Sequence, residues 1–315
     1  MNYKSVTILI PTYNGKRLLE EYLPSVVRAA KSYKGKTEII VVDDGSTDGS
    51  DGFLRNNFPE VRLVKLEKNI GPLLAINEGF RLSKNDIIIL LDNDILVSED
   101  FIAPLVVHFD DKEVFGVGPN LNLLSSESGQ NGSYVFRGGL VFRKGFIETP
   151  MVKLCGGLKQ NLAFLLGGGA AAFDRDKLLK LGGFDELLSP FYWEDADLSY
   201  RAWKRGWKIL YEPKSLIHHQ GHSTISKEHK RHYVDQISER NMYILIWKNI
   251  ADKRLLLCHF LWIPIRFIGY ILVGKYWRIS PIFLALRQFK AINSKRRIEL
   301  REANISDSEL LSIFS

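Results

Sequence analysis

Residues 86–94 read DIIILLDND, an apolar run that ends in two carboxylates separated by one residue. An apolar run such as 87–91 is typical of a strand covered on both faces, as in a parallel sheet. In open α/β sheets, ligands bind outside the carboxyl ends of the strands. Asp92 and Asp94 would stand at such an end, where their oxygens suit Mg²⁺ or Mn²⁺ and, through the ion, a diphosphate. The same residues also suit an ordinary turn, because Asp and Asn are common after strands.

A second strand end carries the same pattern. Residues 37–50 read TEIIVVDDGSTDGS, so Asp43 and Asp44 close another apolar run. Ser46 or Asp48 can cap a following helix, but capping requires only one such residue. A carboxylate fixed at this strand end can accept a hydrogen bond from a base N–H or a ribose hydroxyl. Either Asp43 or Asp44 fits that role.

Apolar strands and helical patterns alternate along the first part of the chain. We expect strands near residues 6–10, 37–42, 61–66, 86–91 and 114–118. We expect helices near residues 16–32, 47–56, 72–82 and 99–109. The alternation predicts an α/β fold with a mostly parallel, doubly wound sheet flanked by helices. The first strand runs into the sequence PTYNG, a sharp exit that would place Tyr13 beside a nucleotide base.

Residues 119–160 interrupt this alternation. A polar loop at 125–133 precedes an alternating stretch at 134–143 that predicts a hairpin, and we interpret the whole segment as an insertion into the α/β pattern. Residues 165–173 then read LLGGGAAAF. Consecutive glycines let a backbone approach a ligand closely, although a tight packing turn also explains them.

Three acids open an amphipathic helix that we expect over residues 194–206. Glu194, Asp195 and Asp197 fall in its first turn, where the helix dipole stabilises carboxylates. Asp197 is also spaced from Arg201 as in an ordinary surface ion pair. Three acids are nevertheless more than capping requires, which indicates a functional role for at least one of them.

These motifs occur in an order that is typical of one family. The segments that carry the likeness are IPTYN (10–14), VDDGSTD (42–48), LDND (91–94), GGA (168–170), GGFDE (182–186) and WEDADL (193–198). Over roughly residues 5–225, the chain resembles inverting family-2 glycosyltransferases with the GT-A fold. The resemblance implies transfer of a sugar from a nucleotide-diphosphate donor with the help of Mn²⁺ or Mg²⁺.

The resemblance also implies roles for individual residues. Asp195 would be the catalytic base with Glu194 beside it, Asp44 would read the base N–H, and Asp197 and Glu194 are reserves for the base. The implied nucleotide-binding residues are Pro11, Tyr13, Asn14, Asp43, Asp44, Asp92 and Asn93. The implied sugar- or acceptor-binding residues are Gly168, Gly169, Ala170 and Asp197. The implied metal ligands are Asp94, Asp92 and His218.

The choice among the histidines rests on position. Residues 216–223 read LIHHQGHS, and a neutral imidazole can ligate a metal. Relatives carry a metal-binding histidine downstream of the base, and His218 matches that position better than His222. His219 sits directly beside it, so the assignment stays open between neighbours.

Positive charge is concentrated near the C-terminus. Residues 227–302 hold 16 Lys and Arg against 6 Asp and Glu, whereas the whole chain has a net charge of +7. Residues 255–274 are nearly all apolar but contain Pro264 and Arg266. A central arginine costs roughly 2.5–3.5 kcal/mol on membrane-insertion scales. The segment can span a membrane, pack on the catalytic domain or lie at an interface, and its aromatic flanks favour a helix pair on an anionic membrane surface.

Composition sets the remaining bounds. With 45% hydrophobic and 25% charged residues, the chain of 315 residues is ordinary for a globular protein. Its two cysteines predict no disulfide framework, as in a reducing compartment. No signal peptide precedes the first strand, so we expect a cytoplasmic protein, peripheral on the inner face of the cell membrane. We expect no nucleic-acid partner, because the basic excess coincides with apolar sequence.

Together these features predict a catalytic domain at 1–225 and a helical region at 226–315. The catalytic domain would divide into a nucleotide-binding half, 1–118, and an acceptor-binding half, 119–225. The expected activity is inverting transfer of one sugar from a UDP- or dTDP-sugar to a lipid-linked or oligosaccharide acceptor in cell-surface polysaccharide synthesis. Processive relatives carry a Gln-x-x-Arg-Trp motif, which the QISERN of residues 236–241 does not match.

Two other functions are compatible with parts of this pattern. One is a catalytically inactive glycan- or membrane-binding protein on the same fold. The other is a sugar-nucleotide pyrophosphorylase, which would need a glycine-rich, basic phosphate loop after the first strand. Residues 11–16 offer only Gly15 and Lys16 for such a loop.

Overall fold

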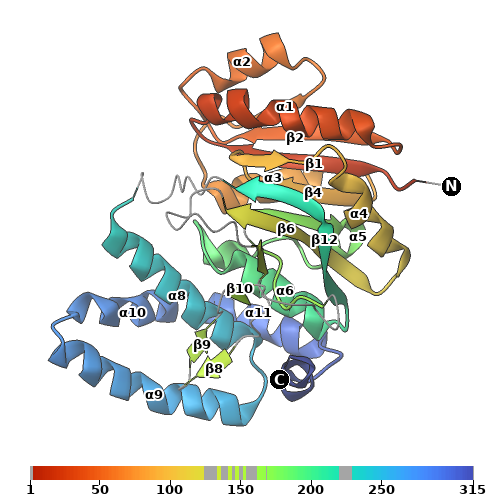
Figure 1. Ribbon diagram of the computed structural model, residues 1–315. Helices are drawn as coiled ribbons and strands as arrows, with labels where there is room; N and C mark the ends of the chain where they lie inside the picture. The colour runs from red at the N-terminus through yellow and green to blue at the C-terminus, as the bar shows by residue number, and fades with distance from the viewer. Residues whose placement is uncertain are drawn as a thin grey trace.

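The computed structural model describes residues 3–123, 133–135, 141–143, 146–148, 152–153, 162–167, 169–219 and 229–314. A large twisted sheet with helices on both faces forms one part of the molecule (Figure 1). The C-terminal helices form the other part and pack below the sheet in that view. Residues Gly168 and His222, both considered above, lie outside the described residues.

One sheet organises the N-terminal part of the molecule. Its strands are β1 (Val6–Thr12), β2 (Thr37–Asp43), β3 (Arg62–Lys65), β4 (Ile87–Leu91), β5 (Ile95–Val97), β6 (Val114–Leu123), β7 (Ser133–Val135), β10 (Val152–Lys153), β11 (Ala170–Asp174) and β12 (Lys208–His219). The order along its main path is β10-β7-β6-β11-β4-β1-β2-β3, and β12 pairs with both β5 and β6.

The four strands at one end of this sheet, β3, β2, β1 and β4, are all parallel. This half follows the expected doubly wound layout, and its strand positions agree with those predicted. The second half is different, because β11 enters antiparallel between β4 and β6. The complete sheet is therefore mixed, and the α/β class with flanking helices is confirmed.

Helices connect and cover these strands. Their bounds are α1 (Lys16–Ser32), α2 (Ser50–Asn57), α3 (Pro72–Leu82), α4 (Ile102–Val106), α5 (Arg175–Lys180), α6 (Glu194–Lys204), α8 (Arg231–Asn249), α9 (Lys253–Leu272), α10 (Ser280–Leu286), α11 (Phe289–Arg301) and α12 (Asp307–Ile313), with short 3₁₀ turns η1 (Val107–Asp110), η2 (Glu186–Leu188) and η3 (Tyr276–Ile279). The helix expected from residue 47 starts later, because Asp48 accepts a hydrogen bond from the N–H of Ser50 and forms a turn instead. The helix expected over 99–109 is α4 followed by η1.

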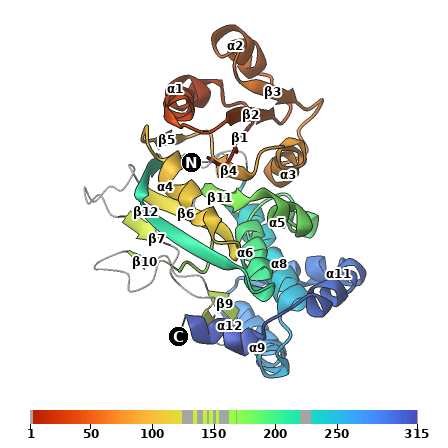
Figure 2. The same ribbon diagram turned by 90° about the vertical axis from the view of Figure 1, so that its right-hand side faces the viewer.

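The sheet is buried on both faces, as the apolar run of β4 predicts. Ile88 and Leu90 contribute to one apolar cluster, whereas Ile87, Ile89 and Leu91 contribute to the other. This alternation follows from the two-residue period of a strand. Figure 2 shows α1 and α3 on opposite sides of β1, β2 and β4.

The predicted hairpin at residues 134–143 is wrong. β7 pairs with β6 and β10, while β8 (Val141–Arg143) pairs with β9 (Phe146–Glu148) in a separate small sheet. The alternation in sequence was real strand character, but pairing partners depend on the whole sheet. The polar loop expected at 125–133 lies almost entirely outside the described residues.

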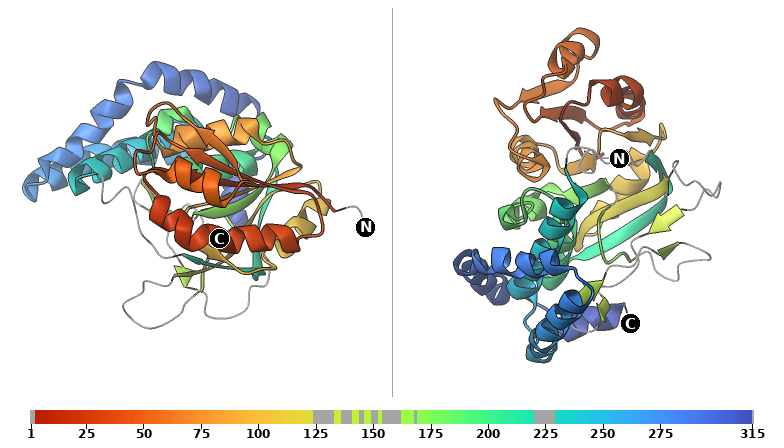
Figure 3. Two further views of the ribbon diagram at one scale, coloured as in Figure 1. Left: turned by 90° about the horizontal axis from the view of Figure 1, so that it is seen from above. Right: turned by 90° about the vertical axis from the view of Figure 1, so that its left-hand side faces the viewer.

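The C-terminal helices share an apolar core with the sheet. Tyr243, Ile244 and Leu245 of α8 are fully buried in the same apolar cluster as Phe115 of β6. Seen from above, the teal and blue C-terminal helices extend past the edge of the sheet (Figure 3). Among the described residues, α9 alone is long and apolar enough to cross a membrane by length and composition.

Candidate active site

A cleft of about 850 Å³ lies at the carboxyl ends of the parallel strands. Its walls include the residues that follow β1 and β4, Asp44 after β2, and the start of α6. A volume in this range is typical of small-molecule and cofactor sites. Parallel strands direct all their carboxyl ends to one edge, so motifs far apart in sequence meet there.

Asp44, and not Asp43, lines this cleft. Its two carboxylate oxygens accept hydrogen bonds from the N–H groups of Ile70 (2.7 Å) and Gly71 (3.0 Å). Burial raises the pKa of Asp44, while these two hydrogen bonds act in the opposite direction. Asp43 is fully buried, and one of its oxygens accepts a hydrogen bond from the N–H of Ser46 (2.8 Å). Asp43 therefore shapes the turn, and Asp44 presents a carboxylate edge to the cleft.

Pro11 and Tyr13 line the cleft as expected, but Asn14 does not. The side-chain oxygen of Asn14 accepts a hydrogen bond from the backbone N–H of Thr47 (2.9 Å). The backbone N–H of Asn14 donates to the hydroxyl of Ser46 (2.8 Å). These bonds tie the exit of β1 to the exit of β2. Asn14 thus has a structural role in this turn, and its nucleotide contact stays a prediction.

Two carboxylates and one imidazole converge beside β4. One ligand atom each from Asp92, Asp94 and His219 lies within 4.8 Å of the others. Nε2 of His219 lies 3.0 Å from Oδ1 of Asp94. Burial and the neighbouring charge of Asp94 raise the pKa of Asp92 to about 6. Carboxylate oxygens with an imidazole nitrogen are a suitable ligand set for a divalent ion such as Mn²⁺.

His219 takes the place in this cluster that was expected for His218. β12 pairs antiparallel with β5, and this register sets His219 opposite Ile95, the residue after Asp94. Because neighbouring side chains of a strand point to opposite faces, His218 is directed away from the carboxylates. Within the described part of the chain, Nδ1 of His218 is buried without a hydrogen-bond partner.

Gly169 explains part of the glycine run. A Cβ atom at this position would lie 2.4 Å from Oδ2 of Asp92, and the residue has a φ of +81°. Its carbonyl also accepts a hydrogen bond from the N–H of Asp92 (2.7 Å). Only glycine fits both requirements without strain. The next residue, Ala170, is buried in β11 opposite Leu91 and does not line the cleft, contrary to its predicted sugar contact.

Glu194 and Asp195 enter the cleft from the first turn of α6. Burial raises the pKa of Asp195 to about 6, although the N–H of Ala196 donates to its Oδ1 (2.7 Å). Burial and the charges of Asp195 and Asp92 raise the pKa of Glu194 to about 8. Among the described residues, Oε2 of Glu194 has no hydrogen-bond partner. Burial thus favours the protonated form of both carboxyl groups, and the neighbouring charges add to this effect at Glu194.

The segment before α6 is held by α8. Tyr192 and Trp193 both have a φ of 71°, a left-handed conformation that costs free energy for residues other than glycine. The side-chain amide of the buried Asn241 lies within hydrogen-bond distance of the carbonyls of Leu188 (2.6 Å), Phe191 (2.8 Å) and Tyr192 (2.9 Å). This support from α8 keeps the two acids at the cleft.

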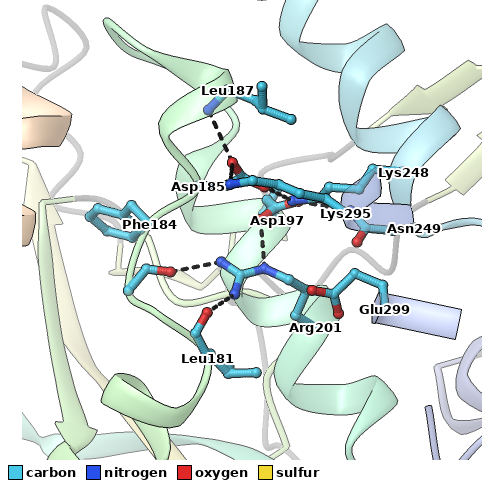
Figure 4. Close-up of polar contacts among 12 residues, drawn as sticks. Leu181, Phe184, Asp185, Leu187, Asp197, Arg201, Lys248, Asn249, Lys295 and Glu299 are labelled. Atoms are coloured by element: carbon cyan, nitrogen blue, oxygen red, sulfur yellow. Dashed lines mark hydrogen bonds and ion pairs between the residues drawn. The ribbon is translucent and has the colours of Figure 1, made fainter. Parts of the chain in front are cut away.

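Asp197 faces away from the cleft into a buried charge network (Figure 4). Its carboxylate contacts Nε of Arg201 (2.7 Å), Nζ of Lys248 (2.6 Å) and the amide of Asn249 (2.7 Å). Burial raises the pKa of Asp197, but Lys248 and Arg201 outweigh that effect and lower it overall. Asp197 therefore does not line the cleft, where an acceptor contact or a reserve base was expected, and its pair with Arg201 is buried rather than on the surface.

The same network joins three helices. Lys248 of α8 also pairs with Asp185, and Lys295 of α11 lies 2.6 Å from that carboxylate. Two helices of the C-terminal region thereby fix the helix that carries the acidic pair. The C-terminal region is part of the scaffold of the site.

Some cleft residues were not anticipated from the sequence. They are Thr12, the loop Asn69–Pro72, Ala75, Pro190, His229 and Tyr233. Gly71 followed by Pro72 is a turn signal directly before a helix, and it could have marked the loop. His229 and Tyr233 have no such signal, because they reach the cleft only through tertiary packing.

Comparisons with known proteins identify the family of this chain and its fold. A model of the family described as glycosyl transferase family 2 matches residues 7–182. A putative polypeptide N-acetylgalactosaminyltransferase 10 of Drosophila melanogaster is 26% identical over 70% of this chain and 36% of its own length. An undecaprenyl-phosphate 4-deoxy-4-formamido-L-arabinose transferase of Pseudomonas savastanoi is 38% identical over 33% of this chain and 32% of its own length. The chain thus spans well under two thirds of these curated relatives.

Two solved structures have a similar fold. The first is GalNAc-T7 with UDP, GalNAc and Mn²⁺, with a TM-score of 0.58 and 18% identity over 80% of this chain and 49% of that chain. The second is the mannosyltransferase PcManGT from Pyrobaculum calidifontis in complex with GDP-Man and Mn²⁺, with a TM-score of 0.56 and 20% identity over 92% of this chain and 76% of that chain. At these identities the likeness describes the fold.

Proposed function

This chain belongs to glycosyl transferase family 2, and from that premise we propose that it is an inverting glycosyltransferase acting on a nucleotide-diphosphate sugar. It transfers a single hexosyl or deoxyhexosyl group from a UDP- or dTDP-sugar to a glycan acceptor carried on a lipid, in cell-surface polysaccharide synthesis. The observation that carries the proposal is one cleft that contains both the Asp92–Asp94–His219 cluster and the Glu194–Asp195 pair.

The donor end of the cleft supports nucleotide binding. Asp44 and Tyr13 line it together with the loop that Asp44 holds by two hydrogen bonds. In this proposal Tyr13 contacts the base and Asp44 accepts its N–H, while Pro11, Asp92 and Asn93 border the ribose and diphosphate. Asp92, Asp94 and His219 would hold Mn²⁺ or Mg²⁺, which when bound supplies Lewis-acid stabilisation of the leaving diphosphate.

The acidic pair supports a division of roles. Asp195, with a pKa of about 6, is ionised at neutral pH and is the base, whereas Glu194, with a pKa of about 8, is protonated. The acceptor oxygen attacks the anomeric carbon, and its proton passes to Asp195. The bond from that carbon to the diphosphate oxygen breaks, so the nucleoside diphosphate leaves with the electron pair. One displacement inverts the anomeric configuration.

The proposal includes attachment to a membrane surface. Leu257, Leu261, Ile265, Ile268 and Leu272 follow one another at helical spacing along α9, and each is between 51% and 80% exposed. This stripe is apolar surface that monomeric soluble proteins rarely expose over so long a run. Exposed basic side chains of the neighbouring segments suit anionic lipid, and they are Lys253, Arg254, Lys275, Arg287, Lys290 and Arg297.

The other face of α9 is bound to protein. Arg266 lies 3.1 Å from the carboxylate of Glu239 on α8 and also contacts Tyr270, and His259 is fully buried. These contacts favour a helix lying on the inner face of the cell membrane over one that spans it. The lipid-phosphate acceptor in the name of the Pseudomonas relative supports a lipid-linked acceptor here as well.

Thermal melting tests the donor site. UDP, dTDP, GDP and CDP are each added with and without Mn²⁺ to the wild type and to Asp94→Ala. A ligand at a hundred times its Kd stabilises by about 2.7 kcal/mol, which raises Tm by a few degrees. We expect a metal-dependent shift with UDP or dTDP that is lost in Asp94→Ala. A wild type that shifts with no nucleotide would instead favour a glycan- or membrane-binding protein without transferase activity.

A further inference from the structure

An aromatic cluster forms the end of the cleft beyond the acidic pair. The ring of Phe191 lies 5.4 Å from that of His229 and 6.2 Å from that of Tyr233, and the last two lie 5.2 Å apart. All three residues line the cleft together with Glu194 and Asp195. Phe191 is almost fully buried beneath, whereas Tyr233 is 40% exposed. Such a surface offers an apolar face and a polar edge, which suits a pyranose ring.

The position of this cluster relative to Asp195 is fixed. Phe191 belongs to the segment that the amide of Asn241 holds, and Trp193 of the same segment donates from Nε1 to the hydroxyl of Ser238 (3.1 Å). Asn241, Ser238 and Tyr233 all belong to α8. Helix α8 therefore positions both the aromatic cluster and the segment that leads to Asp195.

The first turn of α8 also contacts the apolar end of α9. The ring of His232 lies 4.8 Å from that of Trp277, which belongs to η3 directly after α9. Arg278 lies 3.8 Å from Asp235. The end of α9 and the adjoining η3 form an apolar tip of exposed side chains, namely Leu272 (80% exposed), Val273 (64%), Tyr276 (63%) and Trp277 (40%). Tyr233 at the cleft and His232 at the tip are adjacent residues, so the cleft and the exposed apolar tip meet on one turn of α8.

We propose that Phe191, His229 and Tyr233 form the acceptor subsite and that its ligand is a glycolipid. The sugar lies on the aromatic cluster, and its hydrocarbon chain passes Trp277 toward the apolar tip. This inference rests on the proposed function, because it assigns Asp195 as the base that the acceptor hydroxyl must reach. It replaces Ala170 and Asp197 as acceptor contacts, since Asp197 faces the buried network and Ala170 lies inside β11.

The exposed apolar side chains at the end of α9 and in η3, which His232 contacts next to Tyr233 of the cleft, are the observation that favours an amphiphile over a polypeptide or a free oligosaccharide. Burying roughly two methylene groups of an alkyl chain strengthens binding about tenfold. The chain-length dependence of binding is therefore a direct measure of the proposal.

The probes are methyl and octyl β-glycosides of glucose, galactose, mannose and N-acetylglucosamine, used below their micelle concentrations. Binding to the full-length chain is measured by saturation-transfer NMR and titration without donor. We expect octyl members to bind at least about tenfold more tightly than the matched methyl members. Tyr233→Ala should weaken both series, Tyr233→Phe should restore them, and Trp277→Ala should reduce octyl binding to the methyl level.

Tyr3→Ala is the matched control, because Tyr3 is a partly exposed tyrosine outside the cleft. Equal binding of octyl and methyl glycosides, or octyl binding that Trp277→Ala leaves unchanged, would overturn the glycolipid assignment and favour a soluble acceptor. Nucleotide melting shifts with Mn²⁺ are recorded on the same variants. If the wild type shows no melting shift with any nucleotide, the donor site is refuted. If it shows the shift but binds octyl and methyl glycosides equally, only the acceptor subsite is refuted.

Discussion

Nε2 of His219, the last residue of β12, lies 3.0 Å from Oδ1 of Asp94, which follows β4. The contact exists because β12 pairs antiparallel with β5, the short strand that begins directly after Asp94. A late segment of the chain thus completes a cluster that the acidic strand end of β4 begins.

His219→Ala should lower the affinity for Mn²⁺ by at least about tenfold. Loss of a residue that only supports a metal ligand already has an effect of about that size, and a direct ligand should matter at least as much. His218→Ala is the matched control, because the side chain of the adjacent residue points to the other face of the strand. Metal-dependent thermal shifts with nucleotide report both variants. A normal shift in His219→Ala together with a lost shift in His218→Ala would contradict the register-based assignment.

Asp195→Asn should lower the transfer rate by about 10²–10⁴-fold, the usual contribution of a general base. The nucleotide melting shift with Mn²⁺ should persist, since Asp195 is absent from the Asp92–Asp94–His219 cluster. The rate is measured in single turnover with saturating donor. If the variant loses nucleotide binding in parallel with activity, Asp195 is not purely a catalytic group.

Glu194→Gln should stabilise the protein in metal-free buffer, and more so at pH 8 than at pH 5. The folded-state pKa of about 8 lies above the ordinary value of 4.5, so ionisation of Glu194 opposes folding increasingly as pH rises between these values. Removing the charge should increase the free energy of unfolding by on the order of 2 kcal/mol at pH 8. Denaturant unfolding at the two pH values measures the effect. An equal gain at both would show that like-charge repulsion and burial are not its cause.

Lys248→Met should destabilise the fold by about 3–5 kcal/mol, because the buried carboxylates of Asp185 and Asp197 both lose a cation. Lys290→Met, at an exposed position of α11, is the control and should change stability by less than about 0.5 kcal/mol. Urea unfolding at neutral pH compares them. Lys295→Met, which removes a partner of Asp185 alone, should fall between the two if the network is the cause, and equal values for all three would exclude it.

Short-range patterns in the sequence predicted much of the fold. The apolar runs of β1, β2 and β4, the helical patterns between them and the acids at the strand ends are all signals that act over a few residues. They predicted the parallel half of the sheet and the helices around it. The family motifs likewise identified Asp44, Asp92, Asp94, Glu194 and Asp195, and all five line one cleft.

Contacts between distant segments were decided only by the tertiary structure. The sequence alone does not distinguish the adjacent His218 and His219. The β12–β5 register places His219 beside Asp94, and a shift of one residue would exchange the two faces of the strand. Asp197 is the same residue type as Asp195, but its position two residues further along α6 directs it into a network with Lys248. The local sequence gives no sign of this network, because Lys248 is distant in the chain. The sequence by itself determined which elements form and which chemical groups they carry, since propensity and periodicity are local. The structure decided which of those groups share a site, since pairing register and helix packing depend on the whole chain.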